Sequence, residues 1–276
     1  QKSVELQNSL GVNTEWLDRN EIQRITDPCL FPDAIAGAFN ADEGLADPNS
    51  IVMGYINKAQ KQGVTCITDC SATEIVLKNN KINKVKTSTG EIYTECVVNT
   101  CGPWSAFLGR AIGLDIPVSA LRRQWFVTDS LPTLPAEFPF VIDFSKKLYF
   151  HREGSGLLSG MSNPKEIIGE DQSIDPKWEL KHIEAAVKRM PILENTGIRT
   201  RQAGLYEMTP DAHPIIGSTP VDGFYLLTGF SGHGFMHGPV CGKLMSEILI
   251  DGDASTVDIG MLDYNRFSEN RLISEY

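Results

Sequence analysis

The stretch of this sequence best suited to bind a ligand is a glycine-rich turn between a predicted strand and a predicted helix. Residues 229–238 contain glycine at positions 229, 232, 234 and 238, and the apolar run 224–228 before them is typical of a buried strand. Because glycine has no Cβ, the backbone can approach a bound group closely at these positions. The first N–H groups of the following helix favour negative charge at its N-terminus. The turn therefore predicts a site for a ligand that carries negative charge.

Two other interpretations of this turn compete with a ligand site. A turn with a packing role alone has the same glycine content, and this alternative stays open. A hydrolase nucleophile elbow, G-x-S-x-G, is matched at Gly229 and Ser231, but His233 stands where the last glycine belongs. The elbow therefore receives little support, and the sequence offers no catalytic nucleophile.

The dinucleotide-binding fingerprint G-x-G-x-x-G is missing from the chain. The segment from Gly154 to Gly160 has one residue too many in the second gap, and it lies between two predicted strands. Metal patterns are equally poor, because Cys66 and Cys70 are separated by three residues and have no histidine cluster nearby. We expect no metal site, free thiols and a location in the reducing cytoplasm.

Charge and hydropathy argue against two classes of partner. The 276 residues carry a net charge of −10, which opposes binding to nucleic acid unless a basic stripe offsets it. The chain has no such stripe, and the pair Arg122-Arg123 is interpreted as solvated strand positions. No apolar run approaches the roughly 18 residues that cross a bilayer, so we expect no membrane span.

The elements that must position the turn are a mixture of helices and strands. A helix is predicted to begin at Pro48, capped by Asp47, and to end at Gly63. Short β-branched runs predict strands at 64–68, 73–77, 82–88 and 92–99, before a short helix at 103–112. Later strands are predicted at 123–129, 148–152 and 156–161, followed by an amphipathic helix at 176–190. This order predicts a mixed α/β (α+β) fold.

Four motifs in one order carry a resemblance to a known family. They are ADEGLADP at residues 41–48, VVNTCGPWS at 97–105, TPDAHPIIG at 209–217 and GFSGHGFMHG at 229–238. Together they resemble the GxxxP, VVNAAGPWS, TPDxxPxxG and GxSGHGF segments of FAD-dependent oxidoreductases of the D-amino-acid-oxidase family. Residues 148–154, 189–193 and 204–211 are most similar to β subunits of sarcosine oxidases and of dye-linked proline dehydrogenases.

The resemblance implies an incomplete FAD-binding Rossmann-like domain and a substrate domain on a mixed or antiparallel sheet. Residues 1–40 are then an N-terminal helical and loop segment, and residues 116–203 are the substrate domain. The FAD-binding domain comprises residues 41–115 and 204–276. The family's first βαβ unit, of about 30 residues with the phosphate-binding turn, is expected before residue 1. We therefore expect a truncated or processed chain, with FAD bound in the complete protein.

The resemblance also implies contacts with FAD. The backbone at residue 72 is expected near the adenine, the 100–104 turn along the dinucleotide, and residues 204–206 and 232–236 beside the isoalloxazine ring. The implied cofactor-binding residues are Ala72, Thr100, Gly102, Trp104, Gly204, Leu205, Gly232, His233, Gly234, Phe235 and Met236.

The implied substrate-binding residues are Arg152, Tyr149, Tyr206 and Met236. Arg152 is the candidate for a substrate carboxylate, because a guanidinium group suits bidentate pairing. An arginine paired with Glu153 or another carboxylate is the alternative. Tyr149 and Tyr206 are expected to wall the substrate, and each is also typical of the edge of a core.

Three departures from monomeric sarcosine oxidases bear on the activity. Met236 and Leu158 stand where those enzymes carry lysines, the second of which activates oxygen. Gly204 stands where they carry a flavin-linking cysteine, so a covalent link at that point is excluded. These differences favour a dehydrogenase that passes electrons to another acceptor. The implied reaction is FAD-dependent oxidation of a small amino acid or secondary amine, such as sarcosine, proline or glycine, by hydride transfer to the flavin.

Two rival functions remain within this fold. One is a non-catalytic subunit or an apo fragment that no longer binds FAD. The other is a different enzyme of the same fold, such as a glycerol-3-phosphate or D-amino-acid dehydrogenase. The expected partners are a small amine or amino acid and, by resemblance to the β subunits, a partner subunit in a hetero-oligomer.

Overall fold

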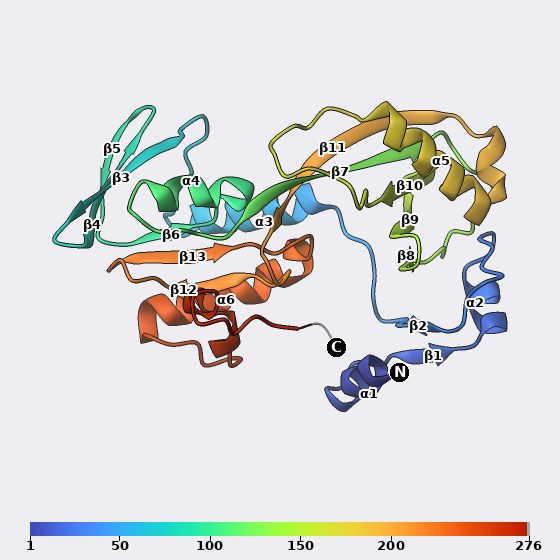
Figure 1. Ribbon diagram of the computed structural model, residues 1–276, viewed down its shortest axis with the longest axis horizontal. Helices are drawn as coiled ribbons and strands as arrows, with labels where there is room; N and C mark the ends of the chain where they lie inside the picture. The colour runs from blue at the N-terminus through green and yellow to red at the C-terminus, as the bar shows by residue number, and fades with distance from the viewer. Residues whose placement is uncertain (275–276) are drawn as a thin grey trace.

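The computed structural model describes residues 1–274, which form two lobes joined by two long strands (Figure 1). One lobe is built on a five-stranded antiparallel sheet of order β11-β7-β10-β9-β8, and the other contains two three-stranded sheets. The long strands β7 and β11 run between the lobes. The predicted mixed α/β fold class is confirmed.

The five-stranded sheet has one face buried against a helix and a second face that is only partly covered. Its strands are β7 (Ser119–Thr128), β8 (Val141–Asp143), β9 (Leu148–Glu153), β10 (Gly156–Met161) and β11 (Ile198–Met208). The covering helix α5 (Pro176–Arg189) is capped by Asp175 and is followed by the 3-10 turn η2 (Pro191–Asn195). Along β9, Leu148 and Phe150 are buried in the core with α5, whereas Tyr149 and His151 are only half-buried. Because side chains alternate between faces, the second group points away from α5.

The other lobe surrounds a sheet of order β12-β13-β6, with strands β6 (Val97–Asn99), β12 (Ile215–Ser218) and β13 (Phe224–Thr228). Strand β13 is parallel to β6 and antiparallel to β12. The lobe includes helices α3 (Pro48–Lys61), α4 (Ser105–Arg110) and α6 (Gly234–Asp251), with the 3-10 turns η1 (Gly102–Trp104), η3 (Gly260–Leu262) and η4 (Tyr264–Arg266). A separate meander consists of β3 (Ala72–Lys78), β4 (Lys81–Thr87) and β5 (Gly90–Tyr93).

The first forty residues pack on the α5 lobe. They form α1 (Lys2–Ser9), β1 (Glu15–Leu17), α2 (Arg19–Ile25) and β2 (Gly37–Phe39). Leu17 and Ile22 are buried in the same core as α5. Arg189 at the end of α5 donates to Asp143 at 2.8 Å and to Asp33 at 2.9 Å, which ties this segment to the sheet.

Several predicted elements differ from the structure. Residues 64–68 are irregular rather than a strand, because Val64 and Ile67 are exposed and no strand within residues 1–274 pairs with them. The strand predicted at 92–99 is two strands, β5 and β6, and the helix predicted at 103–112 is η1 followed by α4. The N-terminal segment, expected as helix and loop, also contains β1 and β2. The predicted boundary between residues 203 and 204 falls inside β11, a strand absent from the prediction.

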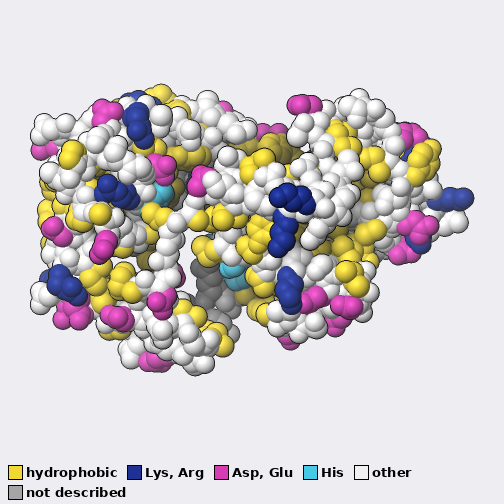
Figure 2. Space-filling view, turned by 180° about the vertical axis from the view of Figure 1, so that it is seen from behind, with side chains coloured by type: hydrophobic (Ala, Val, Ile, Leu, Met, Phe, Trp, Pro, Cys, Tyr) yellow, Lys and Arg dark blue, Asp and Glu magenta, His cyan; other side chains and the backbone are white. Residues whose placement is uncertain are grey.

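The surface between the lobes is partly apolar. Helix α3 has no buried residue and exposes Ile51, Val52, Met53 and Tyr55. Figure 2 shows yellow hydrophobic side chains beside a hollow that separates the two lobes. Within the part of the chain that the structure describes, no helix combines the length and hydropathy needed to cross a bilayer.

Candidate active site

Two turns lie together at the carboxyl ends of the parallel strands β6 and β13, where ligands bind in open α/β sheets. The Ser105 hydroxyl, after the first turn, lies 2.7 Å from the Thr228 hydroxyl at the end of β13. The Thr228 hydroxyl donates to Glu207 Oε2 at 2.9 Å, and the Gly229 N–H donates to the same oxygen at 2.9 Å. Glu207 on β11 therefore anchors the glycine-rich turn, while the hydroxyl pair links that turn to the first one.

The glycines of these turns are required by their backbone geometry. Gly102, Gly229 and Gly232 have φ angles of +54°, +81° and +99°, a region that favours glycine. A Cβ on Gly232 would collide with the ring of Tyr206, and a Cβ on Gly229 with the side chain of Thr209. The glycine-rich turn is thus in direct contact with the end of β11.

The N-terminus of α6 presents free backbone donors. Within residues 1–274, the N–H groups of Gly234, Phe235 and Met236 have no hydrogen-bond acceptor, and His233 before them makes no side-chain cap. Phe235 is 48% exposed and Met236 67% exposed, so this helix end is open to a ligand. An open helix N-terminus behind a glycine turn suits the negatively charged parts of a dinucleotide such as FAD.

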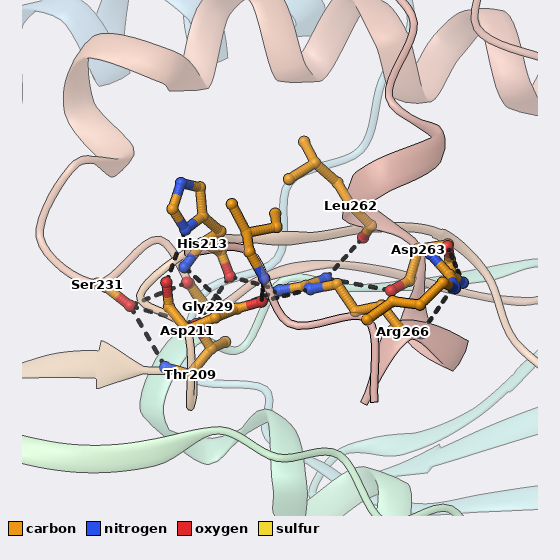
Figure 3. A network of polar contacts seen from close by, with 10 residues as sticks. Thr209, Asp211, His213, Gly229, Ser231, Leu262, Asp263 and Arg266 are labelled. Carbon is orange, nitrogen blue, oxygen red and sulfur yellow. Dashed lines mark hydrogen bonds and ion pairs between the residues drawn. The ribbon is translucent and has the colours of Figure 1, made fainter. Parts of the chain in front are cut away.

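A buried ion pair fixes the segment on which the turn rests (Figure 3). Ser231, with φ of +53°, lies within hydrogen-bond distance of Thr209, two residues before Asp211. Both Asp211 oxygens accept from Arg266, at 2.8 and 3.0 Å. Burial raises the pKa of Asp211, but hydrogen bonds from Arg266 and from the Ile273 and His213 N–H groups lower it to about 2. The pair therefore remains charged and holds the 209–213 segment under the turn.

The face of the five-stranded sheet turned away from α5 collects aromatic and basic side chains. By strand register, Arg123 and Trp125 of β7 share this face with Tyr149 of β9 and Tyr206 of β11. The Arg123 guanidinium lies over the Tyr206 ring, 5.2 Å from its centroid. Burial raises the pKa of Tyr149 strongly, helped by Tyr206 and opposed by Arg123. Tyr149 is therefore a neutral phenol at physiological pH.

The structure brings some predicted site residues together and separates others. Tyr206 contacts the glycine-rich turn and shares the sheet face with Tyr149, but Arg152 does not join them. Arg152 shares a face of β9 with buried Leu148 and Phe150, and it donates to the carbonyls of Leu134 and Pro135 at 3.0 Å. Arg152 therefore does not lie beside the two tyrosines that were also implied to bind substrate, and its role toward a substrate stays a prediction. Nor does Arg152 form an ion pair with Glu153 or any other described carboxylate.

The other predicted cofactor residues occupy four places. Thr100, Gly102 and Trp104 lie in the turn after β6, and Gly204 and Leu205 lie on β11 beside Tyr206. Ala72 begins β3 in the separate meander. Gly232, His233, Gly234, Phe235 and Met236 form the exposed turn into α6. Trp104 donates from its indole to Glu170 at 2.9 Å. Their roles toward FAD stay predictions.

The sequence analysis did not single out two residues of this site, Arg123 and Glu207. The interpretation of Arg122-Arg123 as solvated positions is wrong. Arg122 pairs with the nearly buried Glu166 at 3.0 Å, and Arg123 is half-buried. Alternation along β7 places the two arginines on opposite faces, a signal that the sequence itself contains. No comparable local signal marks Glu207. No group of three or more His, Cys, Asp or Glu side chains among residues 1–274 is arranged to hold a metal ion.

Comparison with known proteins gives matches over nearly the whole chain. A family model described as FAD dependent oxidoreductase (DAO) matches residues 1–248. Mitochondrial sarcosine dehydrogenase of Mus musculus is 27% identical over 291 residues, covering 99% of this chain and 32% of that protein. The mitochondrial regulatory subunit of pyruvate dehydrogenase phosphatase of Mus musculus is 25% identical over 276 residues, covering 94% and 31%. The crystal structure of L-proline dehydrogenase from P. horikoshii matches with a TM-score of 0.91 and 28% identity, covering 99% of this chain and 73% of that one. The chain thus spans about a third of the length of these two curated relatives.

Proposed function

The chain belongs to the DAO family of FAD dependent oxidoreductases, and we propose that it oxidises a small amino acid whose secondary amine lies next to a carboxylate. The family resemblance carried by the four sequence motifs is confirmed. Two of the relatives are named as sarcosine dehydrogenase and L-proline dehydrogenase, and sarcosine and proline are both amino acids of this kind.

The observation that carries the proposal is the open N-terminus of α6 beside the aromatic sheet face. The free N–H groups of Gly234, Phe235 and Met236 and the turns around Gly102 and Gly232 suit a ligand that is large, flat and anionic. Within the described residues, these are the groups that would hold FAD. When bound, FAD supplies the two-electron acceptor for the hydride released from the carbon next to the amine.

The protein side of the reaction is positioning and charge stabilisation. The α6 N-terminus stabilises negative charge that develops near the glycine-rich turn. Neutral Tyr149 and the Tyr206 ring offer flat walls that orient a small substrate and keep water from it. Glu207 accepts from the Gly229 N–H and so fixes the glycine-rich turn relative to Tyr206. The proposed flavin side and the proposed substrate side of the site are therefore both held by β11.

We further propose a dehydrogenase rather than an oxidase. Leu158 of β10 lies on the same sheet face as Trp125 and provides no cation to attract oxygen at that position. The partner subunit in a hetero-oligomer and the cytoplasmic location of this chain stay predictions. The similar sarcosine dehydrogenase is named as a mitochondrial protein, which does not favour the cytoplasmic prediction.

The first test is a visible absorption spectrum of the chain after incubation with FAD and desalting. We expect retained flavin bands that bleach with sarcosine or proline under anaerobic conditions, and no bleaching with glycerol-3-phosphate. Absence of FAD from both this chain and a chain extended at its N-terminus by the expected βαβ unit would contradict the proposal. That result would favour a non-catalytic role, in line with the name of the phosphatase regulatory subunit.

A matched pair of glycine variants locates the cofactor. Gly232→Ala forces a Cβ against Tyr206 at a φ of +99°, and we expect at least about a tenfold loss of FAD affinity. Gly242→Ala, inside α6 with open space around it, is the control and should bind FAD as the parent chain does. Equal affinities of both variants for FAD would remove the glycine-rich turn from the proposed site.

A further inference from the structure

Arg123 is a half-buried cation without a carboxylate partner among the described residues. Its Nη1 donates to the backbone carbonyl of Arg122 at 3.1 Å. Its Nε is buried and has no hydrogen-bond partner, and its Nη2 makes no hydrogen bond within residues 1–274. The N–H groups of Nε and Nη2 lie along one edge of the guanidinium plane, the edge that receives a carboxylate in side-on bidentate pairing.

The neighbours of Arg123 are the groups already assigned to the substrate. Its guanidinium is stacked on the ring of Tyr206. Gly232 of the glycine-rich turn lies against the same ring. Tyr149 lies on the same sheet face, where Gly160 leaves the room that its ring occupies. One aromatic ring therefore separates the unused edge of Arg123 from the turn at the proposed FAD site.

The local electrostatics leave this cation uncompensated. Burial lowers the pKa of Arg123, and Tyr206, Glu166 and Tyr149 act in the opposite direction. Glu166 is not available as a partner, because its Oε1 accepts from Arg122 at 3.0 Å and its Oε2 lies 3.4 Å from the Asn163 amide. An arginine remains protonated in proteins, so its burial is unfavourable until an anion pairs with it.

We propose that Arg123 binds the substrate carboxylate through Nε and Nη2, with its guanidinium supported by Tyr206. The inference rests on the proposed function and gives Arg123 the role that the sequence assigned to Arg152. Arg152 lies on the α5 side of the sheet and donates to two backbone carbonyls. The consequence for specificity is that the site selects amino acids with a free carboxylate over amines that lack one.

The test compares three arginine variants of the full chain loaded with FAD. Arg123→Gln removes the cation, and Arg152→Gln tests the residue expected from the sequence. Arg201→Gln is the matched control, since Arg201 is an exposed arginine on β11 that pairs with Glu179. For L-proline oxidation we expect Arg123→Gln to raise KM by about 10-fold to 150-fold with a smaller change in kcat. Pyrrolidine, the same ring without a carboxylate, should show no such change.

A second measurement reads carboxylate binding without turnover. Tetrahydrofuran-2-carboxylate has the ring size and carboxylate of proline, with an oxygen in place of the ring amine, and calorimetric titration reports its affinity directly. We expect Arg123→Gln to lose at least about tenfold in affinity and Arg201→Gln to bind as the parent chain does. If Arg123→Gln does not fold, Arg123→Lys replaces it. That variant keeps the charge but loses the planar fork, so a severalfold weaker affinity is expected.

The outcomes separate this inference from the proposed function. A parent-like affinity of Arg123→Gln for the carboxylate would overturn the role of Arg123, as would a loss seen in Arg152→Gln instead. Failure of every amino acid to bleach the flavin of the parent chain would refute the oxidoreductase proposal. Calorimetry would still decide whether Arg123 binds carboxylates.

Discussion

Arg266→Met is expected to destabilise the fold by about 3–5 kcal/mol, because it leaves the buried Asp211 carboxylate without its partner. Both side chains are almost fully buried, with exposed fractions of 0% and 1%. Arg266 also donates to the backbone carbonyls of His213, Leu262 and Asp263, at 2.8, 2.9 and 3.1 Å respectively. The substitution therefore leaves five acceptor contacts unmade, two of them to a charge.

The pKa of Asp211 supplies an independent magnitude. A decrease from 3.8 to about 2 corresponds to about 2.5 kcal/mol of stability at neutral pH, at roughly 1.4 kcal/mol per pH unit. A carboxyl with a lowered folded-state pKa contributes this stability above pH 4 and loses it as the pH falls toward 2. In Arg266→Met, only the Ile273 and His213 N–H groups still oppose the effect of burial, so the pKa of Asp211 rises. The deficit of the variant should therefore shrink in acid.

Urea unfolding followed by circular dichroism at pH 7 and pH 4 measures both effects. Arg271→Met is the control, because Arg271 is 46% exposed in its pairs with Asp263 and Glu269, and should cost within about 0.5 kcal/mol. The double variant Asp211→Asn, Arg266→Met should recover part of the loss, since it buries no charge. A loss below about 1 kcal/mol at pH 7, or a deficit independent of pH, would refute this reasoning.

Two further predictions concern the α5 lobe. Burial lowers the pKa of His182 to about 4, and its Nε2 lies 2.8 Å from the Ser159 hydroxyl. The chain should therefore lose up to about 3 kcal/mol as the pH falls from 6.5 to 4, and His182→Gln should remove this dependence in a pH series of Tm values. Asp175→Ala should cost about 1 kcal/mol in urea unfolding, because the Asp175 carboxylate caps α5 by accepting from the Lys177 and Trp178 N–H groups. A cost near zero would show that the Pro176 turn is stable without its cap.

Local signals in the sequence were sufficient for the elements whose own residues determine them. The helix predicted at 176–190 matches α5 because the Asp175 cap, Pro176 and the apolar spacing are all local. The glycine-rich turn was predictable for the same reason, since positive φ angles require glycine wherever the chain lies.

Strand β11 and the choice between arginines depend on tertiary pairing. β11 contains Arg199, Arg201 and Gln202 and shows no apolar alternation, yet it forms because it pairs with β7 along almost its whole length. The sequence motif that contains Arg152 indicated a hairpin correctly, but it did not show which face of the sheet would meet the tyrosines.

Tyr206 and Glu207 are neighbours on β11, one contacting Gly232 through its ring and the other accepting from the Gly229 N–H. A strand displaced at one residue is displaced at the next, so the two contacts cannot be adjusted separately. In the proposed site, selection for a bulkier substrate at Tyr206 would therefore also alter the surroundings of the flavin, and substrate specificity and reduction potential would evolve as one trait rather than two.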